Sequence, residues 1–210
     1  MAKKSTWTTI GKRKIELSNL DPSHGSCLHE PPQRNSSMAL GEIYFWTATV
    51  NKWQNLFSNE QYIEVVLSSL RFLSDSKKID VFAFVIIPNH VHLIWRANSL
   101  NGKESSQGSF LKYTAHEFKK MIRKDNPKEL ESYLIKAANK DYEFWQRDPL
   151  AIPLFTREVA YQKLDYIHSN PIVGKWQLVN DPCDYQYSSA RFYEKGVKDF
   201  EFLKDLREEF

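Results

Sequence analysis

The sequence has few cysteines and no long hydrophobic run. Its only two cysteines, Cys27 and Cys183, belong to no CxxC pair and to no zinc-ligand spacing, which argues against a disulfide framework. The longest uninterrupted apolar run spans residues 81–87, far short of the roughly 20 residues that cross a bilayer. The first residues are positively charged, but no apolar stretch follows them, so secretion is not expected. We therefore expect a cytoplasmic protein with no membrane association.

A large excess of one charge is also missing. The 210 residues carry a net charge of +3 and are 41% hydrophobic, which is typical of a globular protein with a real core. Residues 1–40 hold six basic and three acidic residues, so they account for the whole net charge. Prolines and few periodic apolar positions in this stretch predict a basic N-terminal extension that packs poorly. The mild basicity allows a polyanionic partner but does not require one.

Hydrophobic periodicity predicts ordered structure from residue 41 onward. Residues 42–50 favour a strand, and Ser58 with Gln61 fits a capping box before a helix whose apolar positions run from 63 to 73. Strands are predicted over 80–87 and 90–96, a helix over 109–124, and a last strand at about 141–146. This β-α-β-β-α-β order predicts an α+β fold with a ferredoxin-like, or RRM-like, antiparallel sheet.

Two histidines lie inside the apolar run of the third predicted strand. Because side chains two residues apart share a face of a strand, His90 and His92 are predicted to lie side by side, with Val91 facing away. Two neutral imidazoles on a rigid strand would form half of a metal site. An ordinary strand with two hydrogen-bonded histidines fits equally well. Both interpretations stay open on this stretch alone.

The predicted helix over 109–124 is amphipathic. Its apolar stripe comprises Phe110, Thr114, Phe118, Met121 and Ile122. Its other face is basic and comprises Lys112, Lys119, Lys120, Arg123 and Lys124. A charged helix face is usually no more than solvated surface. It becomes a phosphate-binding surface if a nucleic acid backbone lies nearby.

A third helix is predicted from Thr156 to the residue before Pro171. Its packed face is predicted to comprise Val159, Ala160, Leu164 and Ile167. Positions four apart stack on one helical stripe, which aligns Gln162, Tyr166 and Asn170 away from that face. A half-buried tyrosine and a polar residue before proline would explain this pattern without any chemistry.

Three signatures carry a resemblance to a known family. They are residues 84–95 (Phe-Val-Ile-Ile-Pro-Asn-His-Val-His-Leu-Ile-Trp), 165–171 (Asp-Tyr-Ile-His-Ser-Asn-Pro) and 184–190 (Asp-Tyr-Gln-Tyr-Ser-Ser-Ala). In this order and spacing, residues 41–193 resemble the tyrosine HUH transposases, in the branch called REP-associated tyrosine transposases. The first signature holds the HUH motif, in which U is an apolar residue. We accordingly assign a transposase domain to residues 41–195 and a C-terminal tail to residues 196–210.

The resemblance implies an enzyme. In this family a ferredoxin-like sheet holds the histidine pair, and a separate helix presents the nucleophilic tyrosine. Matching the motifs assigns the nucleophile to Tyr166 and the metal ligands to His90, His92 and Asn170. The implied activity is a transposase and endonuclease, dependent on Mg²⁺ or Mn²⁺, that cleaves and rejoins single-stranded DNA at hairpins through a 5′-phosphotyrosine. The hairpins would be repetitive extragenic palindromes or transposon ends.

The resemblance leaves several features open. The family includes monomers and dimers that exchange the tyrosine helix, so a homodimer is not excluded. DNA contacts would come from the basic helix, and Trp145 and Trp176 are candidates for base stacking, although each also fits a core position. Lys163 and His168 are weak candidates for a general base. Residues 1–40 and 126–140 are not explained by the signatures.

Two other interpretations were weighed. A histidine-triad nucleotide hydrolase would need a third histidine where Ile94 stands, and no glycine-rich phosphate loop precedes it. A binding module without chemistry would present aromatic side chains on the central strands, and Phe82 and Phe84 are predicted to share a face. A catalytically silent relative that binds DNA or RNA hairpins is a variant of this second alternative.

Overall fold

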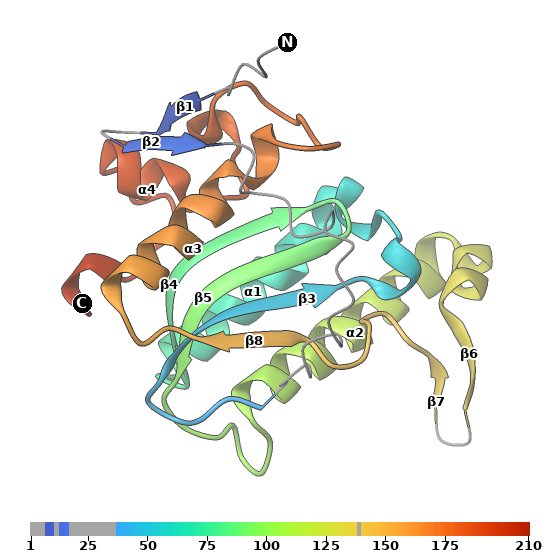
Figure 1. Cartoon of the computed structure of the whole chain (residues 1–210). Coiled ribbons are helices and arrows are strands. Elements are labelled where there is room, and N and C mark those ends of the chain that lie inside the picture. The colour runs from blue at the N-terminus through green and yellow to red at the C-terminus, as the bar shows by residue number, and fades with distance from the viewer. Residues whose placement is uncertain (1–6, 11–12, 17–36, 138–139) are drawn as a thin grey trace, which may run out of the picture.

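The computed structural model describes residues 7–10, 13–16, 37–137 and 140–210. A four-stranded sheet is covered by helices on both faces (Figure 1). The predicted N-terminal extension lies largely outside the described residues. Within it, β1 (Trp7–Ile10) and β2 (Arg13–Glu16) pair antiparallel as a separate two-stranded sheet. In the part of the chain that the structure describes, no helix is long and apolar enough to cross a membrane.

The sheet confirms the ferredoxin-like arrangement. Its strands are antiparallel and lie in the order β4-β5-β3-β8. Their bounds are Ile43–Thr49 for β3, Ile79–Ile87 for β4, His90–Ala97 for β5 and Leu150–Pro153 for β8. With α1 (Glu60–Asp75) after β3 and α2 (Ser106–Asp125) after β5, the chain follows the predicted β-α-β-β-α-β order.

The fourth strand is not where the sequence predicted it. Residues 141–146 were expected to form it, but β7 (Lys140–Tyr142) pairs with β6 (Leu134–Ala137) in another two-stranded sheet. Trp145 turns into the core, where its Nε1 donates to Thr114 Oγ1 at 3.0 Å. The short edge strand β8 ends in Pro153. Proline has no N–H to donate to a neighbouring strand, which an edge strand tolerates because one of its sides has no neighbour.

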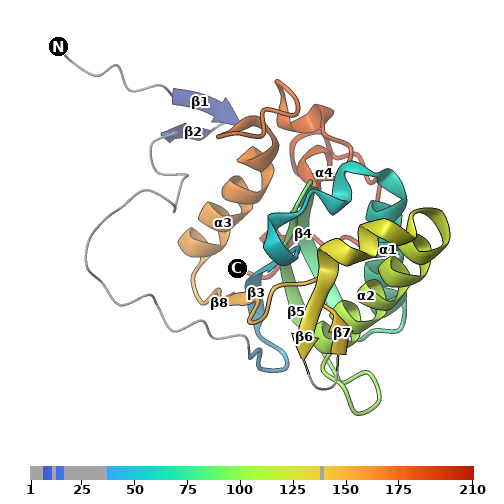
Figure 2. The same cartoon turned by 90° about the vertical axis from the view of Figure 1, so that its right-hand side faces the viewer.

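Helices α1 and α2 pack on one face of the sheet, and α3 (Arg157–Ser169) packs on the other (Figure 2). The cap of α1 is Asn59, whose Oδ1 accepts from Gln61 N at 3.0 Å, so the predicted cap at Ser58 was wrong by one residue. In α3, Ala160, Leu164 and Ile167 are buried as predicted. Val159 is 37% exposed, which contradicts its place in the predicted packed face.

A bulge in β4 separates two aromatic residues that the sequence placed on one face. The pairing of β4 with β5 shifts register between Val81 and Ala83. As a result Phe82 joins the core under α3, whereas Phe84 joins the core under α1 and α2. Both rings are fully buried. They therefore do not form the exposed aromatic pair that a binding sheet would need.

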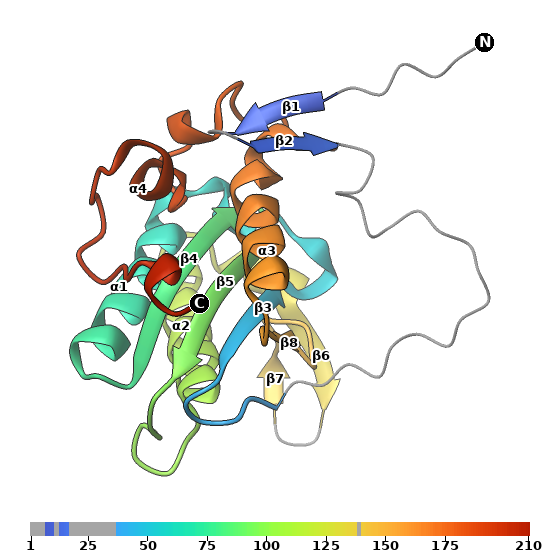
Figure 3. The same ribbon diagram turned by 60° about the vertical axis from the view of Figure 1, so that its left-hand side comes forward.

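The C-terminal part of the chain covers the outer edge of β4 (Figure 3). Tyr187 O accepts from Ile86 N, and Ser189 N donates to Phe84 O, each at 3.0 Å. After α4 (Ala190–Lys195), Leu203 bridges to Val81. Residues 196–210, named a C-terminal tail above, thus contribute buried side chains to the core. Short 3-10 helices complete the chain at Asn51–Trp53, Leu56–Ser58, Pro127–Tyr133, Asn170–Ile172, Pro182–Asp184 and Leu206–Glu208.

Candidate functional site

The two histidines lie at the start of β5, on the sheet face that α3 covers. Their ring centroids are 4.5 Å apart, as the shared strand face predicted. His90 pairs with Thr49 of β3, and His92 pairs with Thr47. His92 is 4% exposed and stacks on Phe45 at 5.3 Å. The pair is therefore held inside the sheet and does not sit in a mobile loop.

Hydrogen bonds at the Nδ1 atoms orient both imidazole rings. His90 Nδ1 lies 2.7 Å from Asn89 Oδ1, and because an amide oxygen only accepts, Nδ1 carries the proton. His92 Nδ1 lies 2.7 Å from Thr47 Oγ1. His92 Nε2 is buried and has no hydrogen-bond partner in the described residues. Rings fixed at Nδ1 with an available Nε2 are the arrangement that histidine ligands of metals adopt.

Both histidines are neutral at physiological pH. Burial and, to a smaller extent, the positive charge of Lys175 together lower the pKa of His90 to about 4. The pKa of His92 is well below its usual value because of burial, with contributions from His90 and Lys163. A neutral imidazole is the form that binds a metal ion.

Tyr166 faces the histidine pair from α3, so the expectation that helical spacing turns it away from the packed face was wrong. Its ring centroid is 5.2 Å from that of His92 and 5.8 Å from that of Phe45, edge to face in both cases. Lys163, one turn earlier, has its Nζ 5.8 Å from the Tyr166 ring and 5.0 Å from the Phe45 ring. Burial lowers the pKa of the Lys163 ammonium. A tyrosine, a lysine and two histidines thus meet between α3 and the sheet.

Asn170 follows one turn after Tyr166, at the C-terminal end of α3. It is 5% exposed, and its backbone N–H donates to Ile167 O. Across the described ranges, no group of three or more His, Cys, Asp or Glu side chains could hold a metal ion. The described His, Cys, Asp and Glu side chains therefore supply no third ligand beside His90 and His92. The unpartnered His92 Nε2 fits a donor set that the Asn170 amide would complete.

A buried hydrogen bond ties α3 to the outer edge of β4. His168 Nε2 lies 2.9 Å from Ser189 Oγ, which in turn accepts from Phe84 N at 3.1 Å. Burial lowers the pKa of His168 to about 3. Its side chain is committed to this contact, so His168 is not the general base. The third sequence signature likewise binds the edge of β4, because Tyr185 Oη donates to Ile86 O at 2.7 Å.

The basic face of α2 lies on the opposite side of the sheet from the histidines. There, Lys112 pairs with Glu104, and Lys120 pairs with Glu117 at 3.4 Å. Lys119 Nζ lies 4.5 Å from the centroid of the Tyr142 ring. Arg123 and Lys124 stand in the last turn of the helix. The structure therefore brings together the predicted nucleophile and the histidines, but it places the predicted DNA-binding residues on another surface.

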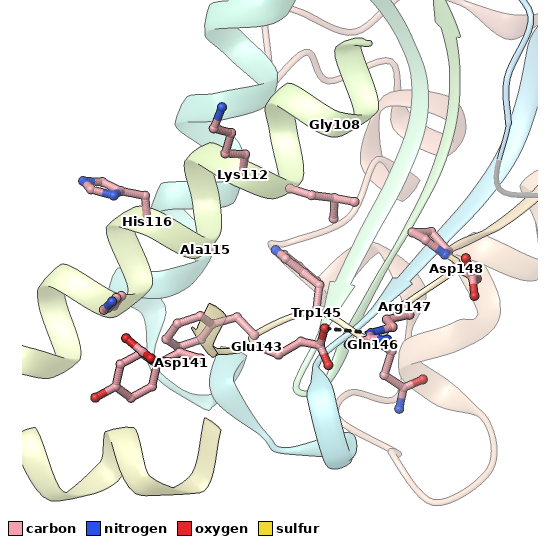
Figure 4. Close-up of a pocket in the computed structure, with 15 residues that line it drawn as sticks. Gly108, Lys112, Ala115, His116, Asp141, Glu143, Trp145, Gln146, Arg147 and Asp148 are labelled. Carbon is pink, nitrogen blue, oxygen red and sulfur yellow. Dashed lines mark hydrogen bonds and ion pairs between the residues drawn. The ribbon is translucent and has the colours of Figure 1, made fainter. Parts of the chain in front are cut away.

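A groove runs between α2 and residues 141–149 (Figure 4). Its volume is about 810 Å³, and its walls include Lys112, His116 and Arg147. Asp141, Glu143 and Asp148 line it as well, so its charge is mixed. The groove reaches β3 where Gln146 N donates to Thr49 O at 2.8 Å. It thus begins at the same end of the sheet as the histidines, across the sheet from them.

Some residues of the site carried no signal in the sequence. Thr47 and Phe45 join His92 only through strand register, which the sequence leaves undefined. Trp53 is 56% exposed and lies 6.4 Å from His90, measured between ring centroids, and nothing in its local sequence marked it. Of the two predicted stacking residues, Trp176 lies 6.4 Å from His90. Trp145 is buried in the core, so of the two alternatives left open for it the core position holds.

Comparison with known proteins supports the fold. No protein-family model and no curated protein sequence matches the chain. Among solved structures, the chain is similar to one described as "Structure of the REP associates tyrosine transposase bound to a REP hairpin", with a TM-score of 0.54 and 17% identity. The match covers 81% of this chain and 95% of that chain. The chain therefore has the fold that the sequence signatures predicted.

Proposed function

We propose that this chain, which has the fold of a REP-associated tyrosine transposase, cleaves and rejoins single-stranded DNA with Tyr166 as the nucleophile. The observation that carries the proposal is the buried His92 Nε2, which has no hydrogen-bond partner in the described residues and stands beside His90 and the Tyr166 ring. Buried polar side-chain atoms in most proteins have a hydrogen-bond partner, so the position of this nitrogen beside a second histidine and a tyrosine calls for an explanation. An orphaned nitrogen next to a tyrosine suits a site completed by a metal ion and a phosphate.

His90, His92 and Asn170 would hold a divalent ion, Mg²⁺ or Mn²⁺. Bound there, the ion would polarise the scissile phosphate as a Lewis acid. Two imidazoles favour Mn²⁺, since Mg²⁺ prefers oxygen ligands. Thr47 and Asn89 would hold both rings at Nδ1, in the orientation that turns Nε2 toward the ion.

The chemical step would be a transesterification. Tyr166 Oη bonds to the phosphorus while the bond from phosphorus to the 3′ oxygen breaks, and the phenolic proton passes through solvent to the released 3′-hydroxyl. The product is a 5′-phosphotyrosine, and attack by a 3′-hydroxyl reverses the step without ATP. A free tyrosine hydroxyl, with a pKa of about 10, is a weak nucleophile at neutral pH. The nearby ammonium of Lys163 would stabilise the negative charge that develops on Oη.

Hairpin DNA is the proposed substrate. The structure to which this chain is similar is described as bound to a REP hairpin. The basic side chains of α2 would contact the phosphate backbone of the hairpin stem, away from the histidines. These residues are Lys112, Lys119, Lys120, Arg123 and Lys124. Such contacts would position the substrate without reading its sequence.

The test is covalent capture. The purified chain would be incubated with labelled single-stranded hairpins from the regions that flank its gene, with Mn²⁺, with Mg²⁺ or with EDTA, and run on a denaturing gel. We expect a protein–DNA adduct that needs metal and is absent in Tyr166→Phe. Tyr113→Phe is the matched control, because Tyr113 is 48% exposed on α2, across the sheet from the histidines.

Two results would count against the proposal. An adduct that persists in Tyr166→Phe would assign the nucleophile to another residue. Tight binding of hairpins with no adduct under any metal condition would instead favour a catalytically silent hairpin-binding module on the same fold.

A further inference from the structure

Two tryptophans adjoin the first histidine of the pair from segments far apart in the sequence. Trp53 ends the 3-10 helix Asn51–Trp53, and Trp176 follows α3. Each ring centroid is 6.4 Å from that of His90, at interplanar angles of 84° for Trp53 and 62° for Trp176. Neither tryptophan belongs to the buried core. Trp176 is half-buried against the core under α3, whereas Trp53 is 56% exposed. The rim of the site therefore carries two large flat rings, each of which leaves part of its surface outside the core.

Trp53 is held in place by its backbone. Lys52 and Trp53 both have positive φ angles, 55° and 57°, which cost energy for residues with a Cβ. Trp53 N donates to Val50 O at 3.0 Å, and Trp53 O accepts from Asn89 Nδ2 at 3.3 Å. The same Asn89 side chain accepts from His90 Nδ1. One amide thus contacts both the backbone of Trp53 and the ring of His90, which ties the segment that carries the exposed tryptophan to the histidine.

A cation lies over one of the two rings, and another lies in the segment that carries the other ring. Lys175 Nζ lies 4.8 Å from the centroid of the Trp176 ring, and its charge is close enough to His90 to lower the pKa of that histidine. Lys52, next to Trp53, is exposed, and its Nζ donates to Ser132 O at 3.1 Å. Aromatic faces alternating with positive charges are typical of surfaces that bind single strands, where bases stack and phosphates pair.

We propose that Trp53 and Trp176 each stack on an unpaired base next to the phosphate held at His90 and His92. The occupant is single-stranded nucleic acid, since paired bases would not present their faces to a ring. This inference rests on the proposed function and adds to it the residues that hold the flanking nucleotides. Stacking of this kind tolerates every base, so it would set the path of the strand and leave sequence recognition to other contacts.

The experiment measures binding without chemistry. The full chain, in EDTA, would be titrated into a labelled oligothymidine of about 20 nucleotides, and into a hairpin with oligothymidine tails, at several salt concentrations. We expect Trp53→Ala and Trp176→Ala each to weaken binding about 5- to 150-fold, with Trp→Phe variants losing less. The salt dependence should keep its slope, because no charge is removed, whereas Lys175→Ala should lower the slope.

Phe72→Ala is the matched control, since Phe72 is 61% exposed on α1, across the sheet from the site. A second measurement leaves the protein intact: abasic residues are placed one at a time along the oligonucleotide, and only the positions that meet a tryptophan should lose affinity. Because this measurement uses only the wild-type protein, it tests the stacking even if a tryptophan variant fails to fold.

The outcomes separate the inference from the proposed function. Wild-type affinity in both tryptophan variants, or no effect at any abasic position, would overturn the stacking even if the Tyr166 adduct forms. Loss of affinity in the variants without any adduct in the capture assay would support the stacking and overturn the catalytic proposal. Failure of the wild-type chain to bind either probe would overturn the inference.

Discussion

Replacing Thr47 with valine tests whether the His92 ring is fixed for metal binding. Thr47 Oγ1 lies 2.7 Å from His92 Nδ1, and His92 Nε2 already has no partner in the described residues. Valine has nearly the same shape but no hydroxyl, so both nitrogens of a buried imidazole would be left unpaired. The ring would also lose the contact that fixes its orientation.

The expected magnitudes differ for stability and for metal affinity. Leaving a buried polar atom unpaired costs about 1–3 kcal/mol of unfolding free energy. For a domain of this size that corresponds to a fall of roughly 2–12 °C in melting temperature. Loss of an outer contact to a metal-bound histidine typically weakens metal binding about 10- to 100-fold. We expect Thr47→Val to show both effects.

Thr49→Val is the matched control for this prediction. Thr49 lies two residues further along β3 and pairs with His90, but its hydroxyl has no hydrogen-bond partner among the residues that the structure describes. Thermal unfolding monitored by circular dichroism, and Mn²⁺ titration by calorimetry, would compare the two variants. Equal Mn²⁺ affinity in Thr47→Val and wild type would refute the role assigned to this contact.

Two further predictions concern stability. Asp80 pairs with Lys204 at 2.6 Å and with Arg96 at 2.7 Å. Burial raises the pKa of the Asp80 carboxyl, but the two cationic partners outweigh burial, so its pKa is lowered overall. Asp80→Asn should therefore lower the unfolding free energy by about 1–3 kcal/mol at neutral pH. This stabilisation is lost as pH falls through the folded pKa, so the unfolding free energies of variant and wild type, measured with urea, should converge in strong acid. A constant difference at all pH values would contradict this prediction. Asn59→Ala should cost about 0.5–2 kcal/mol and Ser58→Ala less than about 0.5 kcal/mol, and the opposite order in urea unfolding would place the cap back at Ser58.

The local pattern of the sequence was enough to predict most of the sheet and the histidine pair. Alternation along β5 places His90 and His92 on one face, independently of the rest of the chain. These predictions hold because each depends on a few neighbouring residues. The meeting of Tyr166 with the histidines was implied only by the family resemblance, since helical spacing had placed Tyr166 away from the packed face of α3.

Features set by distant contacts could not be predicted in this way. The aromatic residues around Trp145 favour a strand locally, but the Thr114 hydroxyl and the rings under α2 draw Trp145 into the core. The bulge between Val81 and Ala83 appears only when β4 pairs with β5. Thr47 likewise becomes part of the site through register with a residue 45 positions away.

The hydrogen bond between His168 and Ser189 bears on how the two halves of the site move. Tyr166 stands two residues from His168 on a rigid helix, and Ser189 is bonded to Phe84 of β4, the strand next to the one that carries the histidines. A displacement of about 1 Å between reacting groups can slow a reaction roughly 100-fold. Because the helix and the sheet are joined through this short buried path, we expect α3 and β4 to move together, so that the distance between tyrosine and histidine changes little as the molecule fluctuates.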